Sequence, residues 1–434
     1  MEYYEINGGR RLAGQVVIHG AKNSVLPLLC ATALADGVSV LHNCPSLSDV
    51  EASIAILRHL GCRVTREGTT VTVDASCLSH SDVPDALMRE MRSSIIFLGA
   101  ILARTGEADV SMPGGCELGP RPIDLHLSAL RKLGAGIEQR GGRLRCTGGA
   151  ALRGAEITLT LPSVGATENI MLCACAAEGV TVIRNAAREP EIVDLARFLR
   201  AMGARIQGEG SSTVRIDGGR GTLRGCEHRV IGDRIVCATY LSAVACAGGE
   251  ASLIGAEPEQ LAAVTGVLRD AGAEILATGP DALTIRRDRP LEGGVVVRTS
   301  PYPGFPTDAQ PVVMAALCNA RRSSLFVETM FENRYRHVDE LRRMGADIRV
   351  EDRVAVVGGT ENGLRGTAVT AHDLRGGGAL CVAALGAEGP TILTGLSHIR
   401  RGYASLPEDL RSLGADIALH TDQNEILEIH RVVR

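Results

Sequence analysis

The hexapeptide Leu57-Arg58-His59-Leu60-Gly61-Cys62 decides the fold of this chain, because close variants of it return five times. The six glycines are separated by 69 or 73 residues and lie at positions 61, 134, 203, 272, 345 and 414. Each copy has the pattern of a helix end, with leucine on the buried face, arginine at the negative end of the helix dipole and a terminal glycine. The repetition predicts six copies of one structural unit of about 70 residues.

The sequence around each copy predicts the other elements of the unit. An alternating segment such as 347–350 follows the glycine, and a turn and a second strand come next. Before each copy, a helix of small residues ends at a polar or glycine turn and enters a short strand, as in 176–183 and 387–393. We therefore expect the order helix, strand, helix, strand, strand in every unit.

Units of this length cannot bury both faces of their helices alone, so neighbouring units are expected to share a core. A single core rarely serves a chain of 434 residues. The six units favour an α/β protein of two domains with three units each, in which helices pack centrally and sheets lie outside.

The composition argues against several classes of protein. The net charge is −4 and aromatic residues make up 3% of the chain without any tryptophan, which disfavours nucleic acid as a partner. The thirteen cysteines form no CxxC pair and no zinc-ligand spacing, so we expect no metal and a reducing compartment. The first residues lack a signal-peptide pattern, and no apolar run reaches membrane-spanning length. We expect a cytoplasmic protein without membrane insertion.

A glycine- and proline-rich segment, 112–126, carries one cysteine among polar residues. Its two adjacent glycines and three prolines are incompatible with a helix or a central strand, so it is expected to be a loop. A cysteine that only fills a core belongs on the face of a helix or strand. The position of Cys116, with Arg121, Asp124 and His126 close behind, therefore favours a chemical role.

The first helix of each unit is expected to begin at a polar residue that lies 37 to 42 residues before the next repeat glycine. These residues are Lys22, Arg92, Ser163, Arg234, Asp308 and Arg375. A helix start offers free N–H groups and the positive end of the dipole, so several starts facing one cleft would bind anions. Asp308 breaks the cationic pattern: it is either a helix N-cap or a general base held near bound anions.

These motifs closely resemble those of the UDP-N-acetylglucosamine 1-carboxyvinyltransferase family, within the EPSP synthase superfamily. The resemblance runs from 20–23 to 401–403, essentially the whole chain, and it is most specific in 113–122, 163–167, 187–194 and 305–308. It implies an inside-out α/β barrel of two domains with three repeats each. One domain would cover 22–232 and the other 1–21 with 233–434, with the active site in the cleft between them.

The resemblance also implies the reaction. Members of the family move the enolpyruvyl group of phosphoenolpyruvate onto the 3′-hydroxyl of UDP-N-acetylglucosamine and release phosphate, through a tetrahedral intermediate. They do so without metal or organic cofactor, in the first committed step of peptidoglycan synthesis. The implied partners of this chain are therefore these two small molecules.

The resemblance assigns roles residue by residue. Cys116 matches the proton donor, and Asp308 matches the residue near the sugar hydroxyl that is proposed as base. Lys22, Arg121 and Arg401 match the cations that grip phosphoenolpyruvate, with Asp373 and Arg375 beside them. The matches on the nucleotide-sugar side are Arg92, Arg121, Pro122, Ile123, Asp124, Leu125, Ser163, Val164 and Gly165. Further positions that match residues lining the cleft are Asn23, Glu189, Arg234, Met330, Phe331 and Arg334.

Three features depart from the pattern of some members. Leu161-Pro162 stands where some have a lysine, Arg400 replaces an acid and adds positive charge, and 376–378 is a run of three glycines that is unusually loose for a helix start. We interpret these departures as variation within the family.

Three alternative functions remain to be weighed. The sister enzyme that forms enolpyruvylshikimate phosphate shares the fold but has no equivalent cysteine loop. A non-catalytic paralogue that only binds a nucleotide sugar is disfavoured by the presence of Lys22, Cys116 and Asp308. A thiol hydrolase would need a Cys-His-carboxylate set, and we interpret His126 as packing on the nucleotide side instead.

Overall fold

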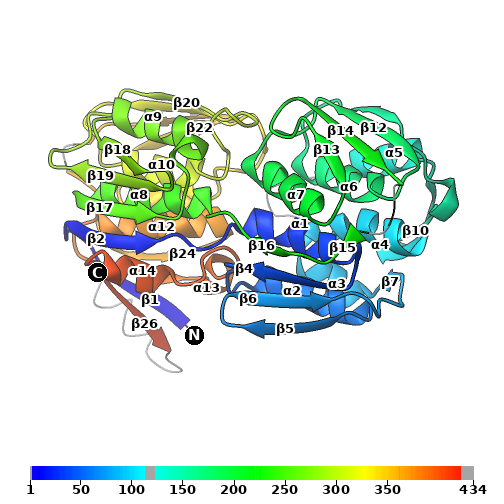
Figure 1. Cartoon of the computed structure of the whole chain (residues 1–434). Coiled ribbons are helices and arrows are strands. Elements are labelled where there is room, and N and C mark those ends of the chain that lie inside the picture. The colour runs from blue at the N-terminus through cyan, green and yellow to red at the C-terminus, as the bar shows by residue number, and fades with distance from the viewer. Residues whose placement is uncertain (1, 113–122, 220, 222, 361, 422–434) are drawn as a thin grey trace. The chain divides into compact units, whose positions relative to one another are not determined.

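The computed structural model describes residues 2–112, 123–219, 221, 223–360 and 362–421 (Figure 1). These residues form two compact units. The N-terminal unit runs from Gly20 to Ile231. The C-terminal unit combines the segment up to His19 with the chain from Gly232 onward.

The N-terminal unit alternates helices, short 3-10 turns and strands. Its helices and turns are α1 (Lys22–Thr32), α2 (Ser48–His59), α3 (Asp85–Glu90), η1 (Arg92–Ile96), α4 (Phe97–Thr105), α5 (Asp124–Lys132), η2 (Gly149–Ala151), α6 (Val164–Ala174) and α7 (Pro190–Ala201). Its strands are β3 (Ala35–Asp36), β4 (Val38–His42), β5 (Arg63–Glu67), β6 (Thr70–Asp74), β7 (Asp82–Val83), β8 (Glu107–Ser111), β9 (Gly136–Arg140), β10 (Arg143–Thr147), β11 (Glu156–Thr158), β12 (Gly179–Arg184), β13 (Arg205–Gln207), β14 (Thr213–Gly218), β15 (Leu223–Arg224) and β16 (Glu227–Arg229).

The C-terminal unit has the same alternation. Its helices and turns are α8 (Arg234–Ala247), η3 (Pro258–Leu261), α9 (Ala262–Asp270), α10 (Gln310–Leu317), α11 (Val338–Arg343), α12 (Leu374–Leu385), α13 (Leu396–Ile399) and α14 (Leu406–Ser412). Its strands are β1 (Glu2–Asn7), β2 (Leu12–Val17), β17 (Gly249–Ile254), β18 (Glu274–Gly279), β19 (Ala282–Arg287), β20 (Val296–Arg298), β21 (Ser324–Val327), β22 (Ile348–Glu351), β23 (Val354–Val357), β24 (Ala368–Thr370), β25 (Pro390–Thr394) and β26 (Asp416–Thr421).

Each unit contains three four-stranded sheets of one design. In the N-terminal unit the strand orders are β16-β4-β6-β5, β7-β8-β10-β9 and β11-β12-β14-β13, and β15 pairs with β3 in addition. In the C-terminal unit the orders are β18-β19-β17-β2, β20-β21-β23-β22 and β24-β25-β1-β26. Every one of these six sheets has a parallel pair at one edge and antiparallel pairs elsewhere, which confirms the sixfold repeat.

The expected order of elements was incomplete, because the repeating unit begins with one more strand. This strand forms the parallel edge of its sheet and is only two or three residues long in β7, β11, β20 and β24. A segment this short shows no alternation of polar and apolar residues, so the sequence gives no signal for it.

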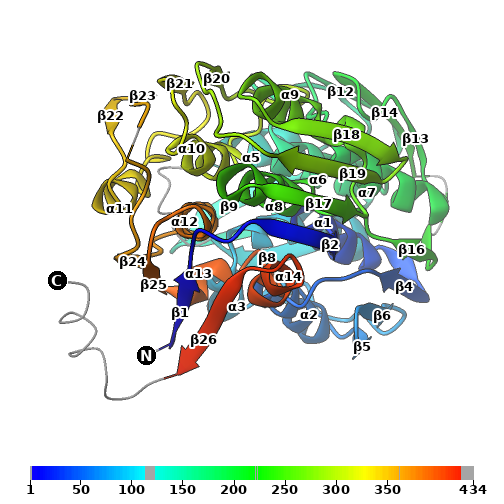
Figure 2. The ribbon, with the colours of Figure 1, turned by 90° about the vertical axis from the view of Figure 1, so that its left-hand side faces the viewer.

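Three sheets take one strand from a distant part of the sequence. β2 pairs in parallel with β17, and β1 lies between β25 and β26, so the N-terminal segment completes two sheets of the C-terminal unit. Figure 2 shows blue β1 alongside red β26. In the N-terminal unit, β16 pairs in parallel with β4 in the same way.

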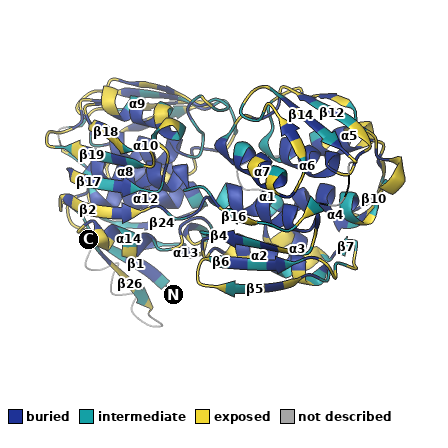
Figure 3. Cartoon of the chain, in the orientation of Figure 1, coloured by how far each residue is buried: buried dark blue, intermediate teal, exposed yellow. Residues whose placement is uncertain are grey.

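The first helices of the repeats form the centre of each unit. In the C-terminal unit α8, α10 and α12 pack on one another, and Figure 3 shows them largely in the colour of buried residues. In the N-terminal unit α1, α4 and α6 are also mostly buried, and α4 packs on α6. The expected α/β arrangement, with central helices and outer sheets, is therefore confirmed. The described part of the chain contains no helix that is long and apolar enough to cross a membrane.

All six repeat glycines end a helix in left-handed conformation, with φ between +85° and +111°. In each copy the glycine N–H donates to the arginine carbonyl three residues before, and the next N–H donates to the leucine carbonyl five residues before. This pair of bonds is the Schellman motif, so the predicted role of these glycines is confirmed.

The arginine of the repeat has a second role that the sequence did not indicate. In four copies its guanidinium donates to the carbonyl six residues later, in the strand that follows the helix. The pairs are Arg58 with Val64, Arg200 with Ile206, Arg269 with Ile275 and Arg342 with Ile348. The arginine thus connects the strand to the helix end. Its positive charge also lies near the negative end of the helix dipole, which is favourable.

Replacing Gly345 by alanine is expected to lower the free energy of unfolding by about 1–2 kcal/mol through backbone strain alone. Its φ is +95°, and a Cβ there meets nothing within 4 Å. Gly345→Asn is the matched control and should cost less, because asparagine tolerates this conformation. Urea unfolding measures both, and equal stability of wild type and Gly345→Ala would contradict the argument.

Candidate active site

The structure places the six expected polar residues at the starts of central helices. Lys22 and Arg234 are the first residues of α1 and α8, Arg375 is the second residue of α12, and Asp308 lies two residues before α10. Ser163 is the N-cap of α6. Arg92 begins η1, which leads directly into α4.

Asp308 lies between two buried arginines in the C-terminal unit. Its Oδ1 is 2.5 Å from Nη2 of Arg334, and its Oδ2 is 3.0 Å from Nη2 of Arg375. The arginine side chains are 1% and 5% exposed and that of Asp308 is 28% exposed, so the carboxylate is accessible while its partners are not. The alternative interpretation of Asp308 as a helix N-cap is wrong, because Ala309 holds that place in α10 without a side-chain bond.

A backbone carbonyl holds Arg334 in place. Arg334 donates from Nε and Nη2 to the carbonyl oxygen of Thr307, at 3.1 and 2.8 Å. Burial lowers the pKa of Arg375, but the charge of Asp308 and its hydrogen bond, together with Tyr403 and Asp233, more than offset this, so the pKa lies above its ordinary value. Arg375 therefore stays charged, and the two guanidinium groups stabilise the negative charge of Asp308.

Asp373 is the N-cap of α12, because its Oδ1 accepts from the N–H groups of Arg375 and Gly376, both at 2.9 Å. The three glycines that follow were expected to loosen this helix start, and this expectation is wrong. They lie in α12 and are buried, and a Cβ at Gly377 or Gly378 would overlap Ile399 or Tyr403. These glycines permit close packing of the helix on its neighbours.

Arg234 is buried at the start of α8, where Asp233 is the N-cap. Its guanidinium carbon lies 5.6 Å from the centre of the Tyr302 ring, within the range of a cation–π contact. Arg401 is half-buried after α13. The neighbouring Arg400 pairs with Glu2 at 2.5 Å, so the extra positive charge expected from Arg400 is compensated.

The loop with Met330 and Phe331 is held by a buried acid that the sequence analysis missed. Oε1 of Glu328 accepts from the N–H groups of Met330 and Phe331, at 2.7 and 3.1 Å, and Oε2 accepts from Oγ1 of Thr307. The Arg334 guanidinium lies 5.6 Å from the Phe331 ring. Glu328 thus connects this loop to the residue before Asp308.

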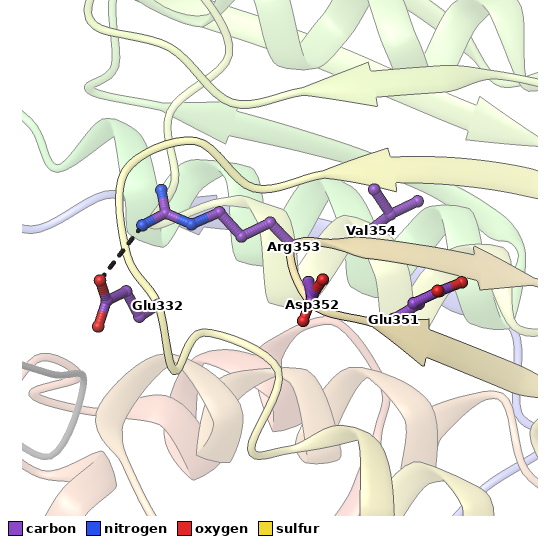
Figure 4. A pocket seen from close by; sticks show the side chains of 5 residues that line it. All are labelled: Glu332, Glu351, Asp352, Arg353 and Val354. Atoms are coloured by element: carbon purple, nitrogen blue, oxygen red, sulfur yellow. Dashed lines mark ion pairs between the residues drawn. The ribbon is translucent and has the colours of Figure 1, made fainter.

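A surface pocket lies at the turn between β22 and β23 (Figure 4). Its lining residues are Glu332, Glu351, Asp352, Arg353 and Val354, and Arg353 pairs with Glu332 at 3.5 Å. The expected site residues are not among them, so we do not assign the reaction to this pocket.

In the N-terminal unit, Lys22 forms an ion pair of 2.8 Å with Asp49, and both side chains are largely buried. Oγ of Ser163 accepts from the N–H of Ala166, which confirms its place at the start of α6. Oγ1 of Thr167 donates to the carbonyl of Ser163 and accepts from the N–H of Ala187. Thr167 therefore connects the start of α6 to the segment that leads to Glu189.

Glu189 precedes α7, and its Oε2 accepts from the N–H of Arg188. Glu168, which the sequence analysis missed, is fully buried on α6, and burial together with Glu191 and Glu189 holds its pKa well above the ordinary value. Asn23 is half-buried on α1. Burial and the two neighbouring carboxylates therefore favour the neutral form of the Glu168 carboxyl.

The segment around α5 is only partly described. Ile123 is buried before the helix, Asp124 is its exposed first residue, and Leu125 is half-buried. Cys116, Arg121 and Pro122 lie outside the described residues. Within the described ranges, no group of three or more His, Cys, Asp or Glu side chains could hold a metal ion.

His337, beside α11, is fully buried, and burial lowers its pKa to about 4. Asp373 raises this pKa and Arg334 lowers it, both by a smaller amount. Since the unfolded chain binds the proton near pH 6.5 and the folded chain only near pH 4, stability should fall as pH decreases through this window. Between pH 7 and 5.5 the expected loss is on the order of 1 kcal/mol.

Urea unfolding at pH 7 and pH 5.5 measures this loss, and His337→Gln should reduce the difference because glutamine does not titrate. The exposed His80 supplies the control variant His80→Gln, which should leave the pH dependence unchanged. An identical pH dependence in wild type and His337→Gln would show that His337 is not responsible.

Comparison with known proteins adds to this geometry. The family profile described as EPSP synthase (3-phosphoshikimate 1-carboxyvinyltransferase) matches residues 6–410. UDP-N-acetylglucosamine 1-carboxyvinyltransferase 2 of Caldanaerobacter subterraneus subsp. tengcongensis is 52% identical over 417 residues, which cover 96% of this chain and 99% of that protein. UDP-N-acetylglucosamine 1-carboxyvinyltransferase 1 of Symbiobacterium thermophilum is 50% identical over 422 residues, with coverage of 96% and 95%.

Solved structures agree on the fold. The enolpyruvyl transferase NikO from Streptomyces tendae has a TM-score of 0.86 at 27% identity and covers 97% of this chain and 99% of its own. An EPSP synthase from Acinetobacter baumannii has a TM-score of 0.77 at 20% identity, with coverage of 97% and 100%. The second likeness, at this low identity, concerns the fold alone.

Proposed function

The chain belongs to the EPSP synthase family, and on that premise we propose that it transfers the enolpyruvyl group of phosphoenolpyruvate to the 3′-hydroxyl of UDP-N-acetylglucosamine and releases phosphate. The observation that carries this function is the 52% identity, over 96% of the chain, to a protein named for this activity. The chain is thus a transferase that acts in peptidoglycan synthesis. The sequence pattern and cysteine usage support a cytoplasmic location.

The reaction needs an acid that protonates carbon and a base that accepts the proton of the sugar hydroxyl. The methylene carbon of phosphoenolpyruvate takes up a proton while the sugar hydroxyl loses one, and the new C–O bond gives a tetrahedral intermediate. The intermediate then loses phosphate and one proton of the new methyl group to a base, which restores the double bond. We assign the acid to Cys116, because its loop motif matches the family position. Lys22, Arg121 and Arg401 neutralise the phosphate and carboxylate of phosphoenolpyruvate.

Asp308 receives the hydrogen bond of the 3′-hydroxyl in this proposal. Its partly exposed carboxylate is held by Arg334 and Arg375 in one orientation. Because two guanidinium groups stabilise its charge, Asp308 is a weak base, and it accepts the proton only as the hydroxyl oxygen bonds to carbon. Its main contribution is therefore to orient the attacking oxygen.

The nucleotide sugar is assigned to residues of the N-terminal unit. The N–H groups of Val164 and Gly165 at the start of α6 point out of the helix without intrahelical partners, and the positive end of the dipole favours the diphosphate. Arg92 adds a positive charge to the same substrate. Asn23, Glu189, Arg234, Met330 and Phe331 are assigned to substrate contacts by their match to the family.

Phosphate release with different acceptors tests the function. The purified protein with phosphoenolpyruvate should release phosphate on addition of UDP-N-acetylglucosamine and not on addition of shikimate 3-phosphate. Release only with shikimate 3-phosphate would identify an enolpyruvylshikimate phosphate synthase. Absence of release with both acceptors, together with binding of the nucleotide sugar, would indicate a non-catalytic paralogue.

A further inference from the structure

One buried amide in the N-terminal unit connects three elements that lie beside the proposed nucleotide-sugar residues. Asn169 lies on α6 and is fully buried. Its Oδ1 accepts from the N–H of Gly99 on α4 at 2.6 Å, and its Nδ2 donates to the carbonyl of Ile95 in η1 at 2.9 Å. The same Nδ2 lies 3.0 Å from Nδ1 of His126 on α5. Both N–H groups of this amide and its oxygen therefore have a protein partner.

These contacts determine which nitrogen of His126 carries the proton. Oδ1 of Asn169 must face the N–H of Gly99 and Nδ2 must face the carbonyl of Ile95, so the amide has only one favourable orientation. Nδ2 is therefore a donor toward His126, and Nδ1 of the imidazole is the acceptor. In the neutral ring the proton then lies on Nε2.

The surroundings of His126 keep the ring neutral. Burial is the largest cause that lowers its pKa, to about 4, and the charge of Arg92 lowers it further, while Asp124 raises it. A charged ring would also place an N–H of Nδ1 against the N–H of Asn169. His126 is therefore an uncharged donor at neutral pH.

The donor edge of the ring lies against the first turn of α6. A Cβ at Gly165 would lie 3.1 Å from Cε1 and 3.4 Å from Nε2 of His126, so the ring edge packs against this glycine. Among the residues that the structure describes, Nε2 of His126 has no hydrogen-bond partner. An uncharged N–H thus lies next to the helix start whose free N–H groups are proposed to bind the diphosphate.

We propose that Asn169 is a positioning residue for nucleotide-sugar binding, because it holds the turn that begins at Arg92 and fixes His126 with its Nε2–H beside the start of α6. The inference rests on the proposed function for the identity of the substrate. Asn169 itself touches only protein groups, so its effect passes through Arg92, His126 and Gly165. It should therefore act on the binding of one substrate and leave the binding of the other unchanged.

The variant Asn169→Asp tests this role because it keeps the size of the side chain and the acceptor for Gly99. It removes the donor toward Ile95 and His126. We expect the KM for UDP-N-acetylglucosamine to rise at least about tenfold, and the KM for phosphoenolpyruvate to stay within about twofold, since two neutral hydrogen bonds are lost. Asn169→Ala removes both the donor and the acceptor of the amide. It should likewise raise the KM for UDP-N-acetylglucosamine and leave the KM for phosphoenolpyruvate within about twofold.

Asn319 in the C-terminal unit provides the matched control. Its amide also bridges two backbone groups: Oδ1 accepts from the N–H of Leu364 and Nδ2 donates to the carbonyl of Gly386, both at 2.9 Å. Asn319→Asp should lower stability in the same way but leave both KM values unchanged. A purely structural role of Asn169 would make the two variants alike in kinetics.

The tautomer of His126 is measurable without turnover. In ¹⁵N-labelled wild-type protein the NMR signals of His126 should show a protonated Nε2 at pH 7, and His126→Gln identifies them by their loss. In Asn169→Asp the carboxylate should draw the proton to Nδ1. Should Asn169→Asp fail to fold, His126→Phe keeps the bulk of the ring without the donor and should raise the KM for the nucleotide sugar, whereas His126→Gln should raise it less.

The outcomes separate the two proposals. If the wild type is active but Asn169→Asp and Asn319→Asp have the same KM for UDP-N-acetylglucosamine, the positioning role is wrong and the proposed function stands. A protonated Nδ1 of His126 in the wild type would also overturn the positioning role alone. No phosphate release by the wild type with UDP-N-acetylglucosamine would overturn the proposed function, and the positioning role for this substrate with it.

Discussion

Replacing Asp308 by asparagine is expected to lower kcat by about two to four orders of magnitude at saturating concentrations of both substrates. The amide presents an N–H group where the carboxylate accepts from Arg334 and Arg375, so the side chain must rotate or lose a contact. In either case the sugar hydroxyl loses the negatively charged acceptor that we propose orients it and takes its proton. The rate of phosphate release measures the effect.

The same change should also destabilise the protein, because it leaves two buried guanidinium groups without their carboxylate. Such a loss costs about 3–5 kcal/mol when a buried pair is broken. Asp339→Asn is the matched control: Asp339 pairs with Arg342 at 2.9 Å on the surface, and its loss should cost about 0–1 kcal/mol and leave kcat unchanged. A kcat of Asp308→Asn within about threefold of the wild type would exclude Asp308 from the proton transfer.

Replacing Cys116 by serine is expected to lower kcat by about three orders of magnitude, because a hydroxyl in place of the thiol is too weak an acid to protonate carbon. Cys116→Asp restores an acid at this position and should retain measurable turnover. The same variant should resist inactivation by a phosphonate epoxide that alkylates the thiol. Phosphate release with and without prior alkylation measures these effects.

A matched control comes from the other cysteines. Among the twelve described ones, only Cys77 is exposed, so Cys77→Ser should leave kcat unchanged and remove the main competing site of alkylation. In this background the pH dependence of alkylation reports on Cys116, whose thiolate the nearby cations should favour in the absence of substrates. Normal turnover by Cys116→Ser would assign the proton transfer to another group.

The six-part architecture was predictable because one physical requirement recurs. A helix that ends in a Schellman motif needs glycine, so the glycines at 61, 134, 203, 272, 345 and 414 mark every unit, and all six have the expected conformation. The first strand of each unit was not predictable, since pairing of two or three residues depends on the neighbouring strand and not on their own pattern.

The candidate site was predictable only in part. Charged residues at helix starts are conspicuous in the sequence, and Lys22, Arg234 and Arg375 lie where they were expected. Asn169, Glu328 and His337 were missed, because a polar residue within a helix or after a strand gives no sign that its partners come from distant segments. The roles in the reaction came from resemblance to the family, since a helix start alone does not name its ligand.

The placement of β1 and β2 determines the order in which the sheets can form during translation. All strands that the structure describes in the N-terminal unit come from residues 35–229, so these sheets can form while the ribosome is still translating the later residues. β1 precedes the other described strands in the sequence, and it pairs with β25 and with β26, which ends at Thr421. β1 therefore stays unpaired until β25 and β26 have been translated, and during this time a chaperone or another chain could bind its free edges.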